Sequence, residues 1–140
     1  MTFPARPAPR NGLYEDAFWS HVRDDHVCIQ LCASCSKFWY LPGPVCPSCQ
    51  SEARTWDRVT GRGRAIAWTT FHRAYFKELP VPHTVVCAAL TEGPLLIVDF
   101  GSDPVRLRLD FPLKLEFIDI QFRGVLRKPF GSFQISCSIW

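Results

Sequence analysis

From Gly61 onward the chain alternates between apolar and polar positions with a period of two, which is the pattern of β-strands with one buried face. Turn residues separate the alternating stretches, and Glu92-Gly93-Pro94 and Gly101-Ser102-Asp103-Pro104 are the clearest of these signals. The pattern predicts strands at about 64–75, 84–91, 94–100, 113–122 and 131–139. No long helix is expected between them.

Two of the expected strands carry further information. The 131–139 stretch alternates without interruption, with apolar residues at the odd-numbered positions from Phe133 to Ile139. The apolar face of the 113–122 stretch changes sides after Phe117, which a β-bulge or a strand that crosses two sheets would explain. Five strands without long helices favour a small closed or partly open barrel, and the OB-fold has this strand count. The periodicity permits an SH3-like barrel or a small sandwich equally well.

A helical periodicity precedes the strands. Within residues 13–22 the apolar positions recur at helical spacing, at Leu13, Ala17, Phe18 and Val22. Glu15 and Asp16 near the start suit the positive end of the helix dipole. Residues 1–12 are rich in proline and are expected to be loosely held. The aromatic pair Phe18-Trp19 could pack on the protein's own core or serve as a partner surface, and the sequence leaves both open.

Seven cysteines stand out in a chain of 140 residues. Their odd number, with no apolar leader segment before them, argues against a disulfide framework. Four of them form the pattern C-x2-C-x10-C-x2-C, at Cys32, Cys35, Cys46 and Cys49. Two CxxC turns supply four thiolates to one tetrahedral ion, so the pattern predicts a structural Zn(II) site with no open coordination position. Iron fits the same sulfur set, whereas a redox CxxC or four unligated core cysteines fits the spacing less well.

Composition excludes several classes of protein. Hydrophobic residues make up 47% and charged residues 21%, which is typical of a globular protein and not of a disordered one. Uninterrupted apolar runs such as Pro94 to Val98 have only the length of a strand, so no membrane span is expected. The N-terminal residues contain no apolar signal segment, and a cytoplasmic location is expected by default.

The strongest local charge lies between Arg54 and Lys77, where six basic residues accompany one acidic residue. Aromatic residues are interleaved with these cations, at Trp56, Trp68, Phe71, Tyr75 and Phe76. On an OB barrel this mixture would suit single-stranded nucleic acid, the phosphates and adenine of CoA, an acidic groove of a protein partner, or solvent alone. The net charge of +3 and the pI of about 8.5 make nucleic acid the less favoured partner, because a dedicated binding domain is expected above about 9.

Catalytic groups are hard to find in the sequence. Cys87 with His72 or His83 would be a thiolate–imidazole pair. However, Cys87 lies in an expected buried strand, where thiols act as packing residues. No carboxylate pair or Ser-His-Asp set can be argued from sequence order. A self-sufficient enzyme is therefore not expected, and an autonomous thioesterase or acyltransferase is kept as the less favoured hypothesis.

The order of these motifs resembles a known family. Phe18-Trp19 precedes the first CxxC turn, Val45-Cys46-Pro47 opens the second, and Trp56 and Gly61-Arg62-Gly63 lead into the first barrel strand. This layout, over residues 13–130, resembles the zinc-ribbon plus OB-fold proteins once filed as domain of unknown function thirty-five and described as acyl-CoA-associated. The chain departs from the family pattern after each CxxC turn, where Ser36 and Gln50 replace the usual glycine.

The motifs and the resemblance together imply a mainly β chain with three parts. These are an N-terminal tail and short amphipathic helix over residues 1–26, a rubredoxin-like zinc ribbon over 27–53, and a five-stranded OB-fold barrel over 54–140. The resemblance further implies a non-catalytic accessory or scaffold subunit. Such a subunit binds a thiolase-fold, acyl-CoA-processing enzyme in a hetero-oligomer and helps to form its acyl-CoA site.

Two groups of residues are expected to carry this function. Arginines leading into and along the first barrel strand should contact CoA phosphates or an acidic rim of the partner, namely Arg62, Arg64 and Arg73. Aromatic residues of the helix and ribbon should anchor the partner, namely Phe18, Trp19, Phe38 and Trp39. The alternative is an OB-fold protein that binds single-stranded nucleic acid with an affinity that falls steeply with salt.

Overall fold

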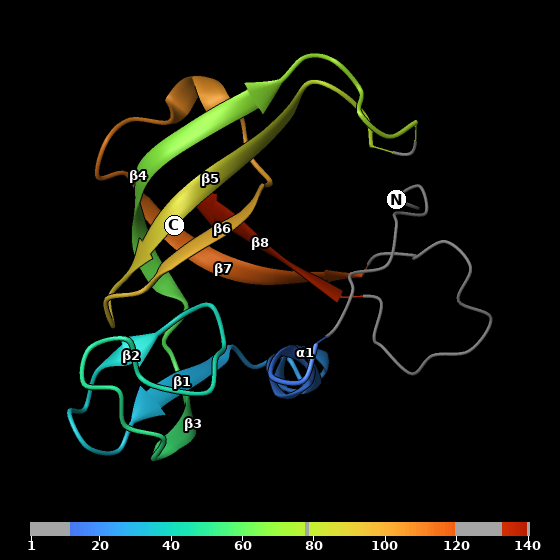
Figure 1. Ribbon diagram of the computed structural model, residues 1–140. Coiled ribbons are helices and arrows are strands. Elements are labelled where there is room, and N and C mark those ends of the chain that lie inside the picture. Colours follow the sequence, from blue (N-terminus) through green and yellow to red (C-terminus); the bar gives the residue numbers. More distant parts are fainter. Residues whose placement is uncertain (1–11, 78, 120–132, 140) are drawn as a thin grey trace.

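The computed structural model describes the backbone of residues 12–77, 79–119 and 133–139, and side chains up to residue 117 apart from residue 78. Its elements in chain order are α1 (Glu15–Arg23), β1 (Cys28–Cys32), β2 (Phe38–Trp39), β3 (Arg54–Arg58), β4 (Arg62–Phe71), β5 (His83–Leu90), β6 (Leu95–Phe100), the 3-10 helix η1 (Pro104–Arg106), β7 (Pro112–Asp119) and β8 (Phe133–Ile139). The strands form a three-stranded sheet and a closed barrel, with α1 beside them (Figure 1). The expected mainly β architecture with one N-terminal helix is confirmed. None of the helices in this part of the chain is long and apolar enough to cross a membrane.

The barrel has the strand order β4-β5-β6-β8-β7 and is closed by antiparallel pairing of β4 with β7. Its other pairs are antiparallel except β6 with β8, which are parallel at Asp99–Ser136 and Phe100–Cys137. This is the five-stranded architecture of an OB-fold, which decides among the alternatives that periodicity left open. A register shift marks a β-bulge in β4 between Ala65 and Ala67. The expected change of face after Phe117 involves side chains beyond those described.

One hydrophobic core joins the helix, the small sheet and the barrel. The inward residues of β5 and β6 are buried, namely Thr84, Val86, Ala88, Leu90, Leu96, Val98 and Phe100. Phe18 and Val22 of α1 and Ile29 of β1 belong to the same apolar cluster. The expected helix begins at Glu15 rather than at Leu13, which is 86% exposed. The buried face of the amphipathic helix α1 is therefore formed by Phe18 and Val22.

The small sheet has the order β2-β1-β3 and contains the first CxxC turn. β3 pairs with β1 along its full length, from Cys28 opposite Arg58 to Cys32 opposite Arg54. The chain therefore leaves this sheet at Arg58 and enters the barrel at Arg62, later than the boundary expected after residue 53. Before β4, Gly61 has a φ of +75°, a conformation that glycine adopts without strain. Within β4, a Cβ on Gly63 would lie 2.5 Å from the carbonyl oxygen of Ala89, so the close approach of β4 to β5 requires glycine.

Candidate metal centre and interaction surface

The four cysteines of the two CxxC turns converge at one end of the ribbon. Their Sγ atoms all lie within 4.8 Å of one another, at Cys32, Cys35, Cys46 and Cys49. The closest pairs are Cys32 with Cys49 at 3.5 Å and Cys35 with Cys46 at 3.6 Å. A tetrahedral ion with metal–sulfur bonds of about 2.3 Å sets its sulfur atoms about 3.8 Å apart, so the cluster fits one four-coordinate metal ion. Cys28 and Cys87 lie outside it, and none of the described cysteines forms a disulfide.

The two CxxC turns repeat one local structure. The N–H of Ser36 donates to the Cys32 carbonyl at 3.0 Å, and the N–H of Gln50 donates to the Cys46 carbonyl at 2.8 Å. Both turns then require a left-handed residue, with φ of 59° at Ser36 and 62° at Gln50. Glycine adopts this conformation at no steric cost. The geometry therefore explains why the resemblance leads one to expect glycine at these two positions.

Backbone N–H groups favour the thiolate form of one cysteine in each turn. The N–H of Cys35 donates to the Cys32 Sγ at 3.4 Å and is the main cause that lowers the pKa of the Cys32 thiol to about 6. Burial opposes the charged form of Cys46, but the N–H groups of Cys49 and Ser48 outweigh it and lower the pKa of that thiol. Burial instead raises the pKa of Cys28, which lies outside the cluster. Because thiolates are the metal-binding form, the donor set suits a soft divalent ion.

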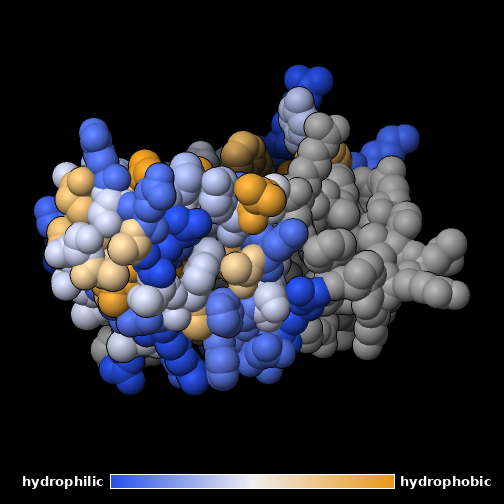
Figure 2. Space-filling view, turned by 60° about the horizontal axis from the view of Figure 1, so that its bottom comes forward, coloured by the Kyte–Doolittle hydropathy of each residue, from blue (hydrophilic) through white to orange (hydrophobic). Residues whose placement is uncertain are grey.

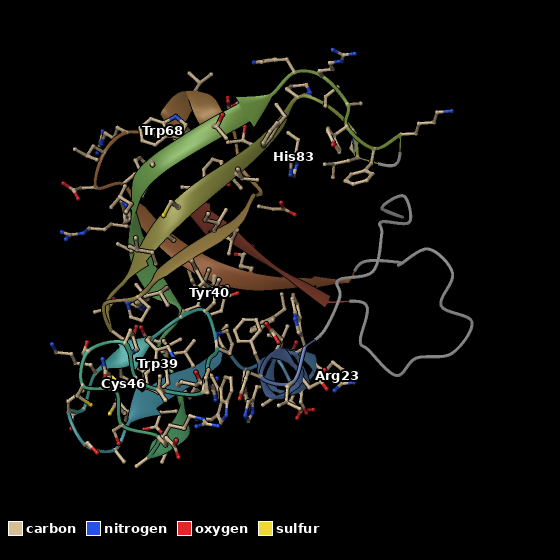
Figure 3. All side chains as sticks on the ribbon, viewed as in Figure 1. Arg23, Trp39, Tyr40, Cys46, Trp68 and His83 are labelled. Atoms are coloured by element: carbon tan, nitrogen blue, oxygen red, sulfur yellow. The ribbon has the colours of Figure 1, made fainter. Side chains whose placement is uncertain are left out.

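Buried side chains hold the loop between the CxxC turns in place. Trp39 is buried against Cys32 and Cys46 (Figure 3). Gln30 of β1 is only 1% exposed, and its side chain donates to the Gly43 carbonyl at 3.1 Å and accepts from the Gly43 N–H at 2.8 Å. Nothing in the sequence singled out Gln30, because glutamine in a strand usually faces water.

The four aromatic residues expected at a partner surface lie largely inside the molecule. Phe18 is 3% exposed and Trp39 8% exposed, so the expectation that they project from the surface is wrong. Trp19 and Phe38 are partly buried against the same core. Phe18, Trp19 and Phe38 pack in the apolar core that the helix, the ribbon and the barrel share, whereas Trp39 packs against the cysteine cluster. Large exposed aromatic side chains occur instead on β4 and the loop that joins it to β5, at Trp68, Phe71, Tyr75 and Phe76.

The outer side of two barrel strands is apolar. We define the outer β5–β6 face as Val85, Cys87 and Ala89 of β5 with Leu95 and Ile97 of β6. The register sets Cys87 opposite Ile97 and Ala89 opposite Leu95, and the side chains of Ile97 and Leu95 are 74% and 49% exposed. An antiparallel sheet with one buried face normally carries polar residues on the other, so this face departs from the rule.

A histidine and an aspartate pair with each other at one end of this face. His83 Nε2 lies 3.0 Å from Asp99 Oδ1, and both side chains are mostly buried. The ring of Phe71 stacks on His83, which stands at the base of the projecting hairpin (Figure 3). The surface at the ribbon end of the molecule differs from the outer β5–β6 face, because its hydrophobic residues are separated by hydrophilic ones (Figure 2).

The three arginines expected to form an anion contact do not come together. Arg62 and Arg64 line a groove of about 620 Å³ beside the β5–β6 turn. The Arg64 Nε lies 3.6 Å from Asp110 Oδ1 in an exposed ion pair. Arg73 is exposed on the hairpin beyond the other end of β4, nine residues from Arg64, which corresponds to about 30 Å of extended strand.

The remaining cations of the basic stretch lie in the ribbon. Arg54 of β3 donates to the Pro44 carbonyl at 2.7 Å and lies over the ring of Tyr14. Arg58 ends the same strand. The charge that is concentrated in the sequence is thus distributed over the ribbon, the start of the barrel and the hairpin tip.

The structure also places the groups considered for catalysis. Cys87 and His83 are four residues apart on β5, a separation of about 13 Å, and His83 is paired with Asp99. His72 is exposed on the hairpin. No thiolate–imidazole pair is assembled between Cys87 and His83.

Comparisons with known proteins agree on the fold. No protein-family model matches the sequence, and no curated protein matches it significantly. A solved structure named "Ltp2-ChsH2(DUF35) aldolase" is similar with a TM-score of 0.80 at 20% identity, over 94% of this chain and 98% of that chain. The chain has the fold of a DUF35 protein. A DUF35 protein of unknown function from Sulfolobus solfataricus is similar with a TM-score of 0.61 at 10% identity, over 93% of this chain and 87% of that chain. Both matches span helix, ribbon and barrel together, so the arrangement of all three is shared with DUF35 structures.

Proposed function

We propose that the chain is a DUF35 family member and a non-catalytic accessory subunit that binds a thiolase-fold, acyl-CoA-processing enzyme and helps to form its acyl-CoA site. The observation that carries this proposal is the outer β5–β6 face, an exposed aliphatic surface on a small barrel. The similarity to a structure named "Ltp2-ChsH2(DUF35) aldolase" supports an enzyme as the partner.

The position of this face supports a binding role. OB barrels commonly bind their ligands on the second and third strands and on the loop that joins the first two strands. In this chain those elements are β5, β6 and the hairpin between β4 and β5. Contiguous exposed apolar surface on a soluble protein typically marks an interaction site, and aliphatic residues with aromatic neighbours suit a protein partner.

The same face argues against single-stranded nucleic acid. An OB-fold that binds nucleic acid sets aromatic rings under the bases and cations along the backbone of one strand. Here the outward residues of β5 and β6 are aliphatic or small, apart from the His83–Asp99 pair. Arg54 and Arg58 lie in the ribbon sheet, away from this face.

The expected contact residues take separate roles in this proposal. Arg62 and Arg64, on a groove with exposed guanidinium groups, contact CoA phosphates. Arg73, on the hairpin with Tyr75 and Phe76, contacts an acidic rim of the partner enzyme. Trp19 and Phe38 retain partial exposure and contribute apolar contact, while buried Phe18 packs against Trp19 and buried Trp39 packs against Cys32 and Cys46. The metal in the four-cysteine site is Zn(II) with a structural role, since four thiolates complete its coordination.

The test is co-purification of the tagged full-length chain from its native lysate at moderate salt after nuclease treatment. We expect a stoichiometric thiolase-fold enzyme, identified by mass spectrometry, to accompany the wild-type chain. Replacing Leu95 and Ile97 together by lysine should remove the enzyme, because two charges would be desolvated in an apolar interface. The matched control is Val105→Lys, at an 86% exposed position on η1, which should retain the enzyme.

Two results would contradict the proposal. One is the absence of any thiolase-fold enzyme while nucleic acid associates in a parallel sample without nuclease, with binding that weakens steeply as salt increases. The other is full retention of the enzyme by the Leu95→Lys, Ile97→Lys double variant, which would move the interface elsewhere.

A further inference from the structure

β6 is an interior strand of the barrel for only part of its length. On one side it pairs with β5 from Leu95 to Asp99. On the other side it pairs with β8 only at Asp99 and Phe100. Within residues 12–77, 79–119 and 133–139, no strand therefore pairs with the 95–98 segment on that side (Figure 1).

The register shows which backbone groups face this open edge. The N–H of Leu90 donates to the Pro94 carbonyl at 2.9 Å where the β5–β6 hairpin begins. Hydrogen-bonded pairs alternate along an antiparallel ladder, so Leu96 and Val98 direct their N–H and C=O groups toward β5. Leu95 and Ile97 direct theirs away from β5, toward the open edge. This edge thus offers the donors and acceptors that an added strand requires.

A groove runs along the same edge. It has a volume of about 330 Å³ and is lined on one side by β6 from Leu96 to Asp99. Val85 of β5 and the rings of Phe18, Trp19 and Tyr40 complete the lining, and the ring of Phe18 lies 5.3 Å from that of Trp19 and 5.4 Å from that of Tyr40. An extended segment of three to four residues spans about 10–13 Å and would fill this space with its apolar side chains.

Within the described part of the chain, the edge lacks the usual protection. Natural sheet edges carry lysine, proline or a bulge that prevents pairing with other chains. Here the sequence is Leu95-Leu96-Ile97-Val98, and the bulge in the barrel lies in β4 between Ala65 and Ala67. An unprotected apolar edge beside an aromatic groove suits a strand that is supplied by another molecule.

We propose that the β6 edge binds an extended segment of a partner protein by strand addition, with apolar side chains of that segment seated against Phe18, Trp19 and Tyr40. The inference rests on the proposed function only for the assignment of that partner as the enzyme. A single extended segment fits better than a second copy of the chain, because the groove lined by Phe18, Trp19 and Tyr40 has a volume of only about 330 Å³, which suits a few residues. Strand addition would use main-chain hydrogen bonds for affinity and the groove for specificity.

The test uses a displayed library of twelve-residue peptides without proline, selected on the immobilised wild-type chain. We expect enriched peptides with apolar residues at alternate positions. Their affinity should fall at least tenfold for Ile97→Pro, which removes an N–H of the open edge while keeping the bonds to β5. Ile97→Val keeps the N–H and a β-branched side chain, so binding to this control should change less than threefold.

Amide hydrogen exchange in the wild-type chain gives a readout that does not depend on the proline variant folding. Addition of an enriched peptide should slow exchange of the Ile97 amide at least a hundredfold, while the Leu96 and Val98 amides, already bonded to β5, change little. Equal binding to a folded Ile97→Pro chain, an Ile97 amide that stays unprotected, or the absence of any enriched peptide would overturn strand addition. A dimer of the chain that Ile97→Pro dissociates would overturn the choice of a partner protein as occupant.

These outcomes are separable from those of the proposed function. If a thiolase-fold enzyme co-purifies but leaves the Ile97 amide unprotected, the accessory role stands and strand addition fails. If peptides bind at the edge but no such enzyme co-purifies, strand addition stands and the assignment of the enzyme fails.

Discussion

The ribbon and the outer β5–β6 face use their distinctive residues in opposite ways. In the ribbon the cysteines, Trp39 and Gln30 turn toward one another, and their contacts lie within the chain. On the outer β5–β6 face, Leu95 and Ile97 turn away from the core, although their residue types are those of a protein interior. The comparison teaches that residue type alone does not separate internal support from external contact. Position relative to the core does.

The largest expected effect comes from breaking the metal centre. Cys46→Ser removes one of four thiolates, and structural zinc sites of this kind contribute on the order of 10 kcal/mol of binding energy to folding. We expect loss of the bound metal and of ordered ribbon structure, measured by elemental analysis and by amide exchange in β1 and β3. Elemental analysis of the wild-type chain should find one zinc per chain.

The matched control for this variant is Cys87→Ser, which changes a cysteine of β5 outside the cluster. It should keep one metal ion per chain. Retention of stoichiometric metal by Cys46→Ser, or an equal loss in Cys87→Ser, would contradict the assignment of the site. If elemental analysis found iron instead of zinc, the assignment of the four-cysteine site would stand and only the identity of the metal would change.

The second prediction compares the loss of stability when a buried ring is truncated with the loss when an exposed side chain is truncated. Phe18→Ala should destabilise the chain by about 3–5 kcal/mol, because Phe18 is 3% exposed and its removal leaves a cavity between helix and barrel. Ile97→Ala should change stability by less than about 0.5 kcal/mol, since that side chain is 74% exposed. Urea unfolding measures both. Similar losses in the two variants would mean that the 95–98 edge is already covered within the isolated chain.

The contrast also explains what could be predicted from the sequence. The CxxC spacing encodes a local geometry that needs only a few neighbouring residues, so the convergence of the four cysteines could be predicted from the sequence. The alternating strands and the turn at Glu92-Gly93-Pro94 likewise depend on local pattern.

Burial of the aromatic residues could not be predicted, because it depends on contacts between distant parts of the chain. Phe18 packs beside Tyr40, and the two lie 22 positions apart in the sequence. The same limit applies to Arg62, Arg64 and Arg73. They are close in sequence, but an extended strand separates the first two from the third.

A smaller loss of stability is expected when the hydrogen bonds between Gln30 and the loop that joins the two CxxC turns are removed. Gln30→Leu keeps the side-chain volume roughly constant but leaves the N–H and C=O of Gly43 without their partner. We expect a loss of about 1–3 kcal/mol in stability, measured by urea unfolding of the metal-bound chain. Thr55→Ala, at an exposed position of β3, is the control and should cost less than about 0.5 kcal/mol. Equal costs would show that water replaces Gln30 at Gly43 without penalty.

The smallest effect concerns the two left-handed residues of the CxxC turns. Ser36→Gly and Gln50→Gly should each stabilise the chain by about 0.5–1 kcal/mol, because glycine relieves the steric cost of a φ near +60°. Thermal unfolding of the metal-bound chain measures the gain. The direction is unusual, since glycine in most positions lowers stability through the entropy of the unfolded chain.

Lys37→Gly is the matched control for this gain, because Lys37 follows Ser36 in the same turn but is not among the residues of positive φ. It should destabilise the chain by about 0.5–1 kcal/mol. A gain at Ser36 and Gln50 together with a loss at Lys37 would show that backbone conformation, rather than side-chain contact, selects glycine after a CxxC turn. Losses at all three positions would instead mean that the Ser36 and Gln50 side chains stabilise the ribbon by more than their backbone strain costs.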